Sequence, residues 1–232
     1  LPVAAASALA VLATIGVLFF RGQAPATAGD GRRSVAVFYF DNLTGDPSLD
    51  WLRTGLTDML VTNLSQSPGL RVLGTSRLYQ LLEETGHRDD RTVSAQVVDA
   101  VSSKAQATTA LVGSFVRAGS QVRIQATLQD PKSGEVLASE RVEGDAEEGL
   151  FALVDELTGR LRRRLETPSP TRMSARRHAS SWDWKEKKLQ EVTTTSVEAW
   201  KAYAEGSRLH ERLQEKEAQA FFEKAVEADP GF

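Results

Sequence analysis

A short polar loop is the strongest candidate in this sequence for binding chemistry. Asp41, Asn42, Thr44, Gly45 and Asp46 follow an apolar run typical of a buried strand, and a helix is expected just beyond them. Open α/β sheets bind ligands in the crevice at the carboxyl ends of their strands, so this position favours a ligand-binding loop. The same residue types also form Asx turns and helix caps, and this purely structural alternative remains open.

Catalytic and metal-binding patterns are not found elsewhere in the sequence. His87, His178 and His210 are far apart and lack partner ligands at metal-binding spacing. The aspartates of the polar loop lack the spacing of a calcium-binding loop. Neither a phosphate-binding glycine loop nor a nucleophile elbow is present. We therefore expect no catalytic residue, no metal and no cofactor in this chain.

The composition excludes several classes of protein. The chain has 232 residues, of which 41% are hydrophobic and 25% charged, so it can fill a core and is not disordered throughout. A net charge of −3 provides no overall attraction to polyanions, and we expect no nucleic-acid partner. Because cysteine is absent, disulfides, thiolate metal sites and cysteine nucleophiles are excluded.

The beginning of the chain has the pattern of a membrane anchor. Residues 1–20 carry no charge, and a helix of that length rises about 30 Å, the thickness of a bilayer hydrocarbon core. A cleaved signal peptide is the alternative, because small residues recur at Ala24-Pro25-Ala26. We expect 1–20 to form one transmembrane helix and 21–33, which is rich in small residues, to form a juxtamembrane linker.

Residues 34–165 are predicted to form an α/β domain. Asp50 is placed to cap the first helix, whose apolar spacing leaves Arg53, Thr57 and Asn63 for water. The order of elements predicts a mixed sheet with flanking helices. Strands are expected at 34–40, 70–74, 109–116, 121–129 and 135–142, and helices at 51–67, 75–86, 94–105 and 145–165.

Residues 196–232 have a different pattern, with two amphipathic helices expected at 196–212 and 215–229. One repeat cannot bury its own face, so we expect this to be the truncated start of an array that continues after residue 232. The residues that fall at the spacing of an α-helical tetratricopeptide repeat are Gly206, Ala218, Phe222, Ala225 and Pro230.

A linker is expected at residues 166–195, between the α/β domain and the helices. It contains Trp182 and Trp184, which flank a single aspartate. Tryptophan is enriched at interaction hot spots, so these two side chains are candidates for an exposed interaction anchor. The alternative is that they dock the linker onto the neighbouring domain.

Residues 34–165 resemble the TolB amino-terminal-like domain in several short sequence motifs, which occur in the same order along the chain. They are Phe40-Asp41-Asn42 with Gly45-Asp46, then Gly55-Leu56-Thr57, then Gly113-Ser114 beside an expected hairpin. The resemblance implies an α/β module related to the FlgO and CsgG envelope proteins. In bacteria such modules follow a single transmembrane helix and precede tetratricopeptide repeats.

The resemblance implies a non-catalytic sensory or protein-interaction region of a membrane-anchored signalling protein. The parent would carry a cytoplasmic Ser/Thr protein kinase domain upstream, which places 34–232 outside the inner membrane. The alternatives are the equivalent region of an adenylate cyclase or winged-helix transcription regulator, and a structural or assembly component of the envelope. We expect protein or peptide partners on the repeats, membrane contact through 1–20, and self-association into a homo-oligomer.

Overall fold

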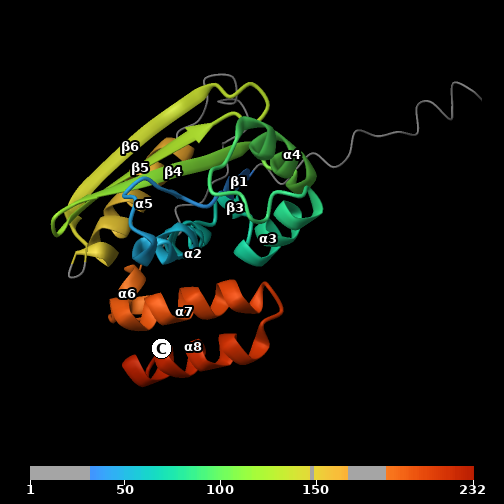
Figure 1. The fold of residues 1–232 in the computed structure, drawn as a ribbon. Helices are drawn as coiled ribbons and strands as arrows, with labels where there is room; N and C mark the ends of the chain where they lie inside the picture. The colour runs from blue at the N-terminus through green and yellow to red at the C-terminus, as the bar shows by residue number, and fades with distance from the viewer. Residues whose placement is uncertain (1–31, 147–148, 167–186) are drawn as a thin grey trace, which may run out of the picture. The chain divides into compact units, whose positions relative to one another are not determined.

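The computed structural model describes residues 32–146, 149–166 and 187–232 (Figure 1). The expected membrane helix, most of the juxtamembrane linker, and Trp182 and Trp184 lie outside these residues. Among the described helices, none combines the length and the apolar character needed to cross a bilayer. The described elements all belong to one compact unit, Arg33–Phe232.

A six-stranded mixed sheet forms the centre of this unit. β1 runs parallel to β3 and β4, whereas β4, β5 and β6 are antiparallel neighbours. The strand order is β3 (Leu70–Val72), β1 (Arg33–Val37), β4 (Thr109–Ala118), β5 (Gln121–Gln129) and β6 (Val136–Asp145), with the short β2 (Asp41–Asn42) beside β4.

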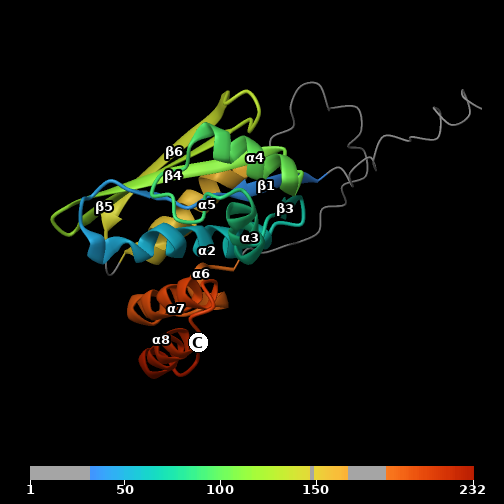
Figure 2. The same cartoon turned by 45° about the vertical axis from the view of Figure 1, so that its right-hand side comes forward.

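Helices cover both faces of the sheet, as Figures 1 and 2 show. Because successive strand residues point to opposite faces, β1 contributes to two hydrophobic clusters. Val35 and Val37 pack with α2 (Trp51–Ser65) and α5 (Leu150–Glu166). Ala36 packs with α3 (Thr75–Glu84) and α4 (Ala95–Ala105). The prediction of a mixed sheet with flanking helices is confirmed.

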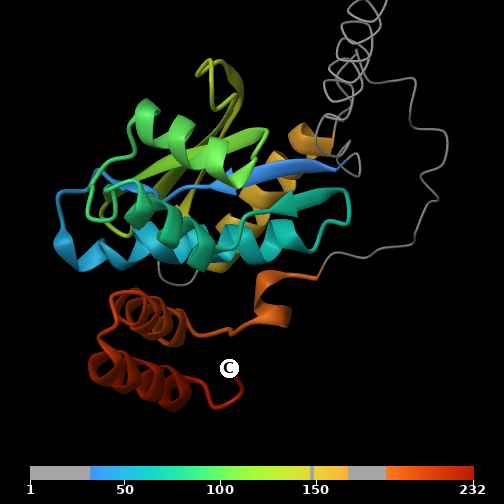
Figure 3. The same cartoon turned by 90° about the vertical axis from the view of Figure 1, so that its right-hand side faces the viewer.

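The last part of the chain forms a helical hairpin on α2 (Figure 3). The short α6 (Leu189–Val192) leads into α7 (Val197–His210), and α8 (Glu215–Ala228) returns alongside it. Trp200 of α7 is 2% exposed and belongs to the same core cluster as α2 and α5. Its ring meets Phe151 edge-on, with 6.3 Å between ring centroids. The hairpin therefore shares its core with the α/β domain.

The cap predicted for α2 is wrong. The Asp50 side chain makes no capping hydrogen bond to α2. Instead a 3-10 turn, η1 (Pro47–Leu49), comes first, and Asp46 caps it by accepting a hydrogen bond from the Ser48 backbone N–H at 2.9 Å. The proline in the first turn favours this earlier start, since it needs no N–H partner there.

Two α2 residues expected to face water are fully buried. Thr57 Oγ1 donates a hydrogen bond to the Phe38 carbonyl oxygen at 2.9 Å, which ties α2 to the chain after β1. Asn63 Nδ2 donates to Asp155 Oδ1 of α5 at 2.8 Å. Buried polar groups are tolerated when they are hydrogen-bonded, and both partners come from distant segments that the helical pattern does not reveal.

Candidate functional site

Asn42 is the centre of the predicted ligand loop. Its Oδ1 accepts hydrogen bonds from the backbone N–H and the hydroxyl of Thr44, at 3.0 and 2.6 Å. Its Nδ2 donates to the Asp46 carbonyl oxygen at 3.0 Å and to Asp50 Oδ1 at 2.7 Å. Gly45 has φ +74°, a conformation that glycine adopts without a steric penalty. The amide is thus used within the turn, and ligand binding by this loop remains a prediction.

The Asp41 side chain takes no part in the hydrogen bonds of this turn. Its Oδ1 is buried without a hydrogen-bond partner among the described residues. Burial raises the pKa of the Asp41 carboxyl, while the Val93 backbone N–H and the charge of Arg53 act in the opposite direction. This side chain is therefore the least satisfied polar group of the predicted loop.

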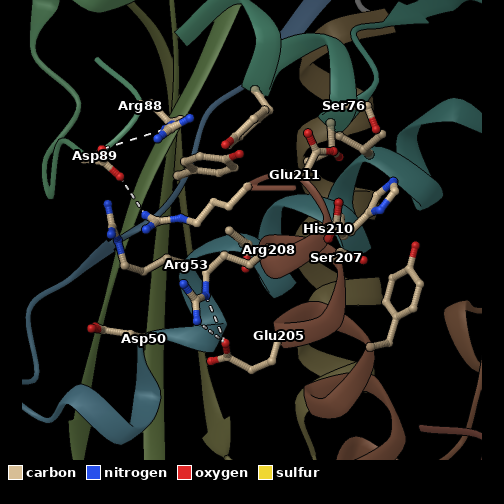
Figure 4. Close-up of a pocket in the computed structure, with 18 of the residues that line it drawn as sticks. Asp50, Arg53, Ser76, Arg88, Asp89, Glu205, Ser207, Arg208, His210 and Glu211 are labelled. Carbon is tan, nitrogen blue, oxygen red and sulfur yellow. Dashed lines mark hydrogen bonds and ion pairs between the residues drawn. The ribbon is translucent and has the colours of Figure 1, made fainter. Parts of the chain in front are cut away.

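A larger pocket lies where the sequence predicted none. It has a volume of about 840 Å³ and is formed by α2, α3, the segment 88–91 and α7 (Figure 4). Its lining is mostly polar and includes the ionisable side chains Tyr39, Asp58, Tyr79, Arg53, Arg88, Asp89, Arg208, His210, Glu211 and Arg212.

Arg53 of α2 holds one wall of this pocket. Its Nη2 donates to the carbonyl oxygens of Asp90 at 3.0 Å and Arg91 at 2.9 Å, which fixes the segment between α3 and α4. Its Nε is buried and has no hydrogen-bond partner among the described residues. The guanidinium is therefore held in place through Nη2, while its Nε–H is left without a partner among the described residues.

The arginines contributed by α7 and its C-terminal end already have carboxylate partners. Arg212 Nη2 contacts Asp89 Oδ1 at 2.6 Å, which links the end of α7 to the segment after α3. Arg208 Nη2 contacts Glu205 Oε2 at 2.9 Å, within α7. In Figure 4, Arg53, Arg88 and Arg208 lie on one side of the pocket, and Ser76, His210 and Glu211 lie on the other. Asp89 and Glu205 lie among these arginines, so both signs of charge occur on that side of the pocket.

Asp58 of α2 is a half-buried carboxylate that lines the same pocket. Burial raises the pKa of Asp58 to about 6; a hydrogen bond with the Thr75 side chain lowers it, and the charge of Glu211 raises it further. No cation pairs with Asp58 among the described residues. An uncompensated carboxylate in such a place favours a ligand that carries positive charge.

Tyr39 also lines this pocket. Burial raises the pKa of Tyr39 well above its usual value; Asp58, Glu211 and Tyr79 raise it further, whereas Arg53 lowers it. All four groups are therefore within electrostatic range of this one hydroxyl.

The pocket could not be found from the sequence because its residues come from segments that share no motif. Its lining extends from Tyr39 to Phe222 and exists only because α7 packs on α2. The raised pKa of Asp58 depends on that packing too, since Glu211 follows α7. In the described part of the chain, no group of three or more His, Cys, Asp or Glu side chains could hold a metal.

Fold and site together define a mixed α/β domain that carries a helical hairpin and a polar pocket beside it. No family model matches the chain. A curated relative, "Putative adenylate cyclase 3" of Rhizobium meliloti (strain 1021), is 33% identical over 125 residues. The match covers 54% of this chain but 19% of that relative, so this chain spans a small part of the relative's length.

Solved structures of bacterial proteins are also similar to this chain, at 15 to 16% sequence identity. The C-terminal domain of LpoB from Escherichia coli has a TM-score of 0.42, with 52% of this chain and 87% of that one covered. Lipoprotein GNA1162 from Neisseria meningitidis has 0.42, covering 57% and 97%. TolB from Acinetobacter baumannii has 0.39, covering 61% and 30%.

Proposed function

We propose that this chain is the non-catalytic, protein-interacting region of a bacterial signalling protein whose output is made by a separate catalytic domain. The observation that carries the proposal is an apolar groove along α8. Phe222 and Val226 form an apolar line there, and Val226 is 53% exposed. A groove along this line is flanked by Glu215, Glu223 and Glu227.

The groove has the chemistry of a helix-binding surface. An apolar line along one helix face suits a partner helix with apolar residues at the same spacing, and flanking carboxylates suit basic residues beside them. The partner we propose is therefore an amphipathic helix with an apolar stripe and basic flanks. The hairpin shares a core with the α/β domain through Trp200, so it presents this surface on a fixed base.

The finer proposal is that α7 and α8 are the first of several tetratricopeptide repeats. Gly206 supports it, because a Cβ there would lie 2.7 Å from the ring atom Cδ1 of Phe222 and 3.3 Å from the Ala218 carbonyl oxygen. A small residue at this point lets the two helices approach closely, as the repeat requires.

The output domain that we propose is a nucleotide cyclase. The likeness to the Rhizobium relative, whose name is that of an adenylate cyclase, supports this choice over the Ser/Thr kinase that the family resemblance suggested first. We further propose that residues 1–20 anchor the protein in the inner membrane, with 34–232 outside the cytoplasm. The uncharged character of 1–20 supports this anchor.

The test is cyclic AMP formation by the whole encoded protein in cells, with and without residues 33–232. We expect deletion to leave a catalytic domain that still makes cyclic AMP but at a changed, unregulated level. Val226→Lys should reproduce the effect of the deletion, because it adds positive charge where a basic partner must bind. Leu137→Lys is the matched control, since Leu137 is a comparably exposed apolar residue on β6 at 49%.

Two results would contradict the proposal. One is an equal level of cyclic AMP for the intact, deleted and Val226→Lys proteins. The other is the same change for Leu137→Lys as for Val226→Lys, which would mean that the α8 groove has no special role.

A further inference from the structure

We propose that the outer edge of β6, from Ala138 to Asp145, binds an extended acidic segment of a partner protein as an added strand. The arrangement that carries the inference is a sheet edge with an arginine on each of its two faces, Arg141 and Arg160. This surface is separate from the α8 groove, so the inference goes beyond the proposed function and does not depend on it.

The edge of β6 is open in the described part of the chain. β6 is the last strand of the sheet, and the strand it pairs with there is β5 (Figure 1). Their antiparallel ladder is regular from Ala138, which pairs with Leu128, to Asp145, which pairs with Gln121. A strand in this position presents a row of backbone N–H and C=O groups to which a further strand can pair.

The direction of the backbone groups of β6 follows from a hydrogen bond at its end. The Ala146 N–H donates to the Ser120 carbonyl oxygen at 2.9 Å, so Ala146 faces β5. Because residues of an antiparallel ladder face the partner strand and the opposite side in turn, the backbone groups of Ser139 and Arg141 point away from β5. The Arg141 carbonyl oxygen agrees with this direction, since it accepts a hydrogen bond from Arg160 Nη1 of α5 at 2.8 Å.

Arginine side chains on both faces of the edge define the charge of the partner. Val142 packs in the core cluster with α5, so its neighbour Arg141 points to the opposite face of the sheet. Arg141 is exposed and makes no ion pair with another described residue. On the α5 face, Arg160 reaches the edge itself, and Arg164 Nε contacts Glu140 Oε1 of β6 at 2.9 Å. Acidic side chains on either face of an added strand would therefore meet an arginine.

Binding would exchange one hydrogen bond for another at the centre of the edge. A backbone N–H of the added strand would replace Arg160 Nη1 at the Arg141 carbonyl oxygen. An acidic side chain next to that N–H would then accept a charge-assisted hydrogen bond from the displaced guanidinium. A second acidic residue, directly opposite Arg141, would pair with the Arg141 side chain on the other face. We therefore expect adjacent acidic residues in the bound segment.

The experiment is fluorescence anisotropy on the 232-residue chain, kept in a mild detergent, with the labelled peptide VTEEETV as the probe. Its palindromic sequence allows either strand direction, with the central glutamate opposite Arg141. We expect a submillimolar Kd for this peptide and at least about tenfold weaker binding of VTKKKTV. Hydrogen exchange at the amides of Ser139 and Arg141 should slow when VTEEETV binds, because these N–H groups are then paired.

Two substitutions at Ser139 separate backbone pairing from other effects. Ser139→Pro removes an outward N–H and no hydrogen bond to β5, and proline is tolerated at such positions of an edge strand. It should weaken the binding of VTEEETV by about tenfold or more. Ser139→Ala is the matched control, because it keeps the N–H and should bind the peptide as the wild type does. Arg141→Gln should weaken binding by about threefold or more, since it removes one charge partner.

The inference is overturned by no binding of VTEEETV at about 1 mM, by equal binding of VTKKKTV, or by binding without slower exchange at Ser139 and Arg141. Wild-type binding by Ser139→Pro would also overturn it, with thermal unfolding as the check that this variant folds. If that variant does not fold, wild-type binding by Arg141→Gln has the same consequence. The cyclic AMP experiment tests α8 and not this edge, so the two proposals fail separately.

Discussion

Gly55 of α2 lies directly against the indole of Trp200 of α7. A Cβ built on Gly55 would be 3.5 Å from Trp200 Nε1, an ordinary van der Waals distance, and 3.1 Å from Cε3 of Trp51, a tight contact within α2. The indole N–H of Trp200 has no hydrogen-bond partner among the described residues. Trp200 therefore contributes to holding the hairpin on the α/β domain by packing and not by a hydrogen bond.

Trp200→Ala should release the hairpin from α2. Truncation of a buried tryptophan removes a large apolar contact and leaves a cavity, at a cost of about 3–5 kcal/mol in the free energy of unfolding. Hydrogen exchange should show faster exchange of the α7 and α8 amides, while the amides of β4 and β5 stay protected. Unchanged protection of α7 and α8 would show that Trp200 does not hold the hairpin.

Gly113→Ala should destabilise the sheet. A Cβ at this position would lie 2.2 Å from Cε1 of Phe40 and 2.6 Å from the Gln125 carbonyl oxygen, so ring and backbone must both shift. We expect a loss of about 1–3 kcal/mol, measured by chemical denaturation. Gly69→Ala is the control, because the nearest atom to its Cβ would be Glu166 Oε1 at 3.9 Å. Equal stabilities of the two variants would contradict this account of the core.

Asn42→Ala tests the structural role of the polar loop. The substitution removes four hydrogen bonds, to Thr44, Asp46 and Asp50, in a partly exposed turn. We expect the free energy of unfolding to fall by about 1–2 kcal/mol, measured as a lower midpoint of thermal unfolding. A midpoint equal to that of the wild type would mean that this turn does not stabilise the fold.

Asp58→Asn should change how stability depends on pH. Burial raises the pKa of Asp58 from 3.8 to about 6, so between these values the folded chain keeps a proton that the unfolded chain loses. The wild type therefore loses stability as pH rises through this window. The variant has no such charge to bury and should be more stable at pH 7 by about 1–3 kcal/mol. Below pH 3.8 the difference should disappear, and urea denaturation at both pH values measures it.

Local patterns were sufficient for most elements of the fold. The alternation of Val122, Ile124, Ala126 and Leu128 predicted a strand at 121–129, which is β5. Alternating apolar residues indicate that one face of a strand is buried, and this pattern can be read from the residues of that strand alone. The five apolar positions of α2 are all buried for the same reason: Leu52, Leu56, Met59, Leu60 and Leu64.

Features that depend on distant segments could not be predicted in this way. The short β2 exists because Asp41 and Asn42 align with Ser114 and Phe115 of β4. The pocket likewise requires Arg53 and Asp58, on α2, to face residues at the end of α7 such as Glu211. Neither relationship leaves a periodic signal, because each joins positions far apart in the chain.

The most direct test of the central claim compares the purified 232-residue chain with the whole encoded protein when both are supplied with ATP and Mg²⁺. We expect cyclic AMP from the whole protein, and neither cyclic AMP nor ADP from the 232-residue chain. Formation of either product by the 232-residue chain alone would contradict the claim that this region binds other molecules without converting them.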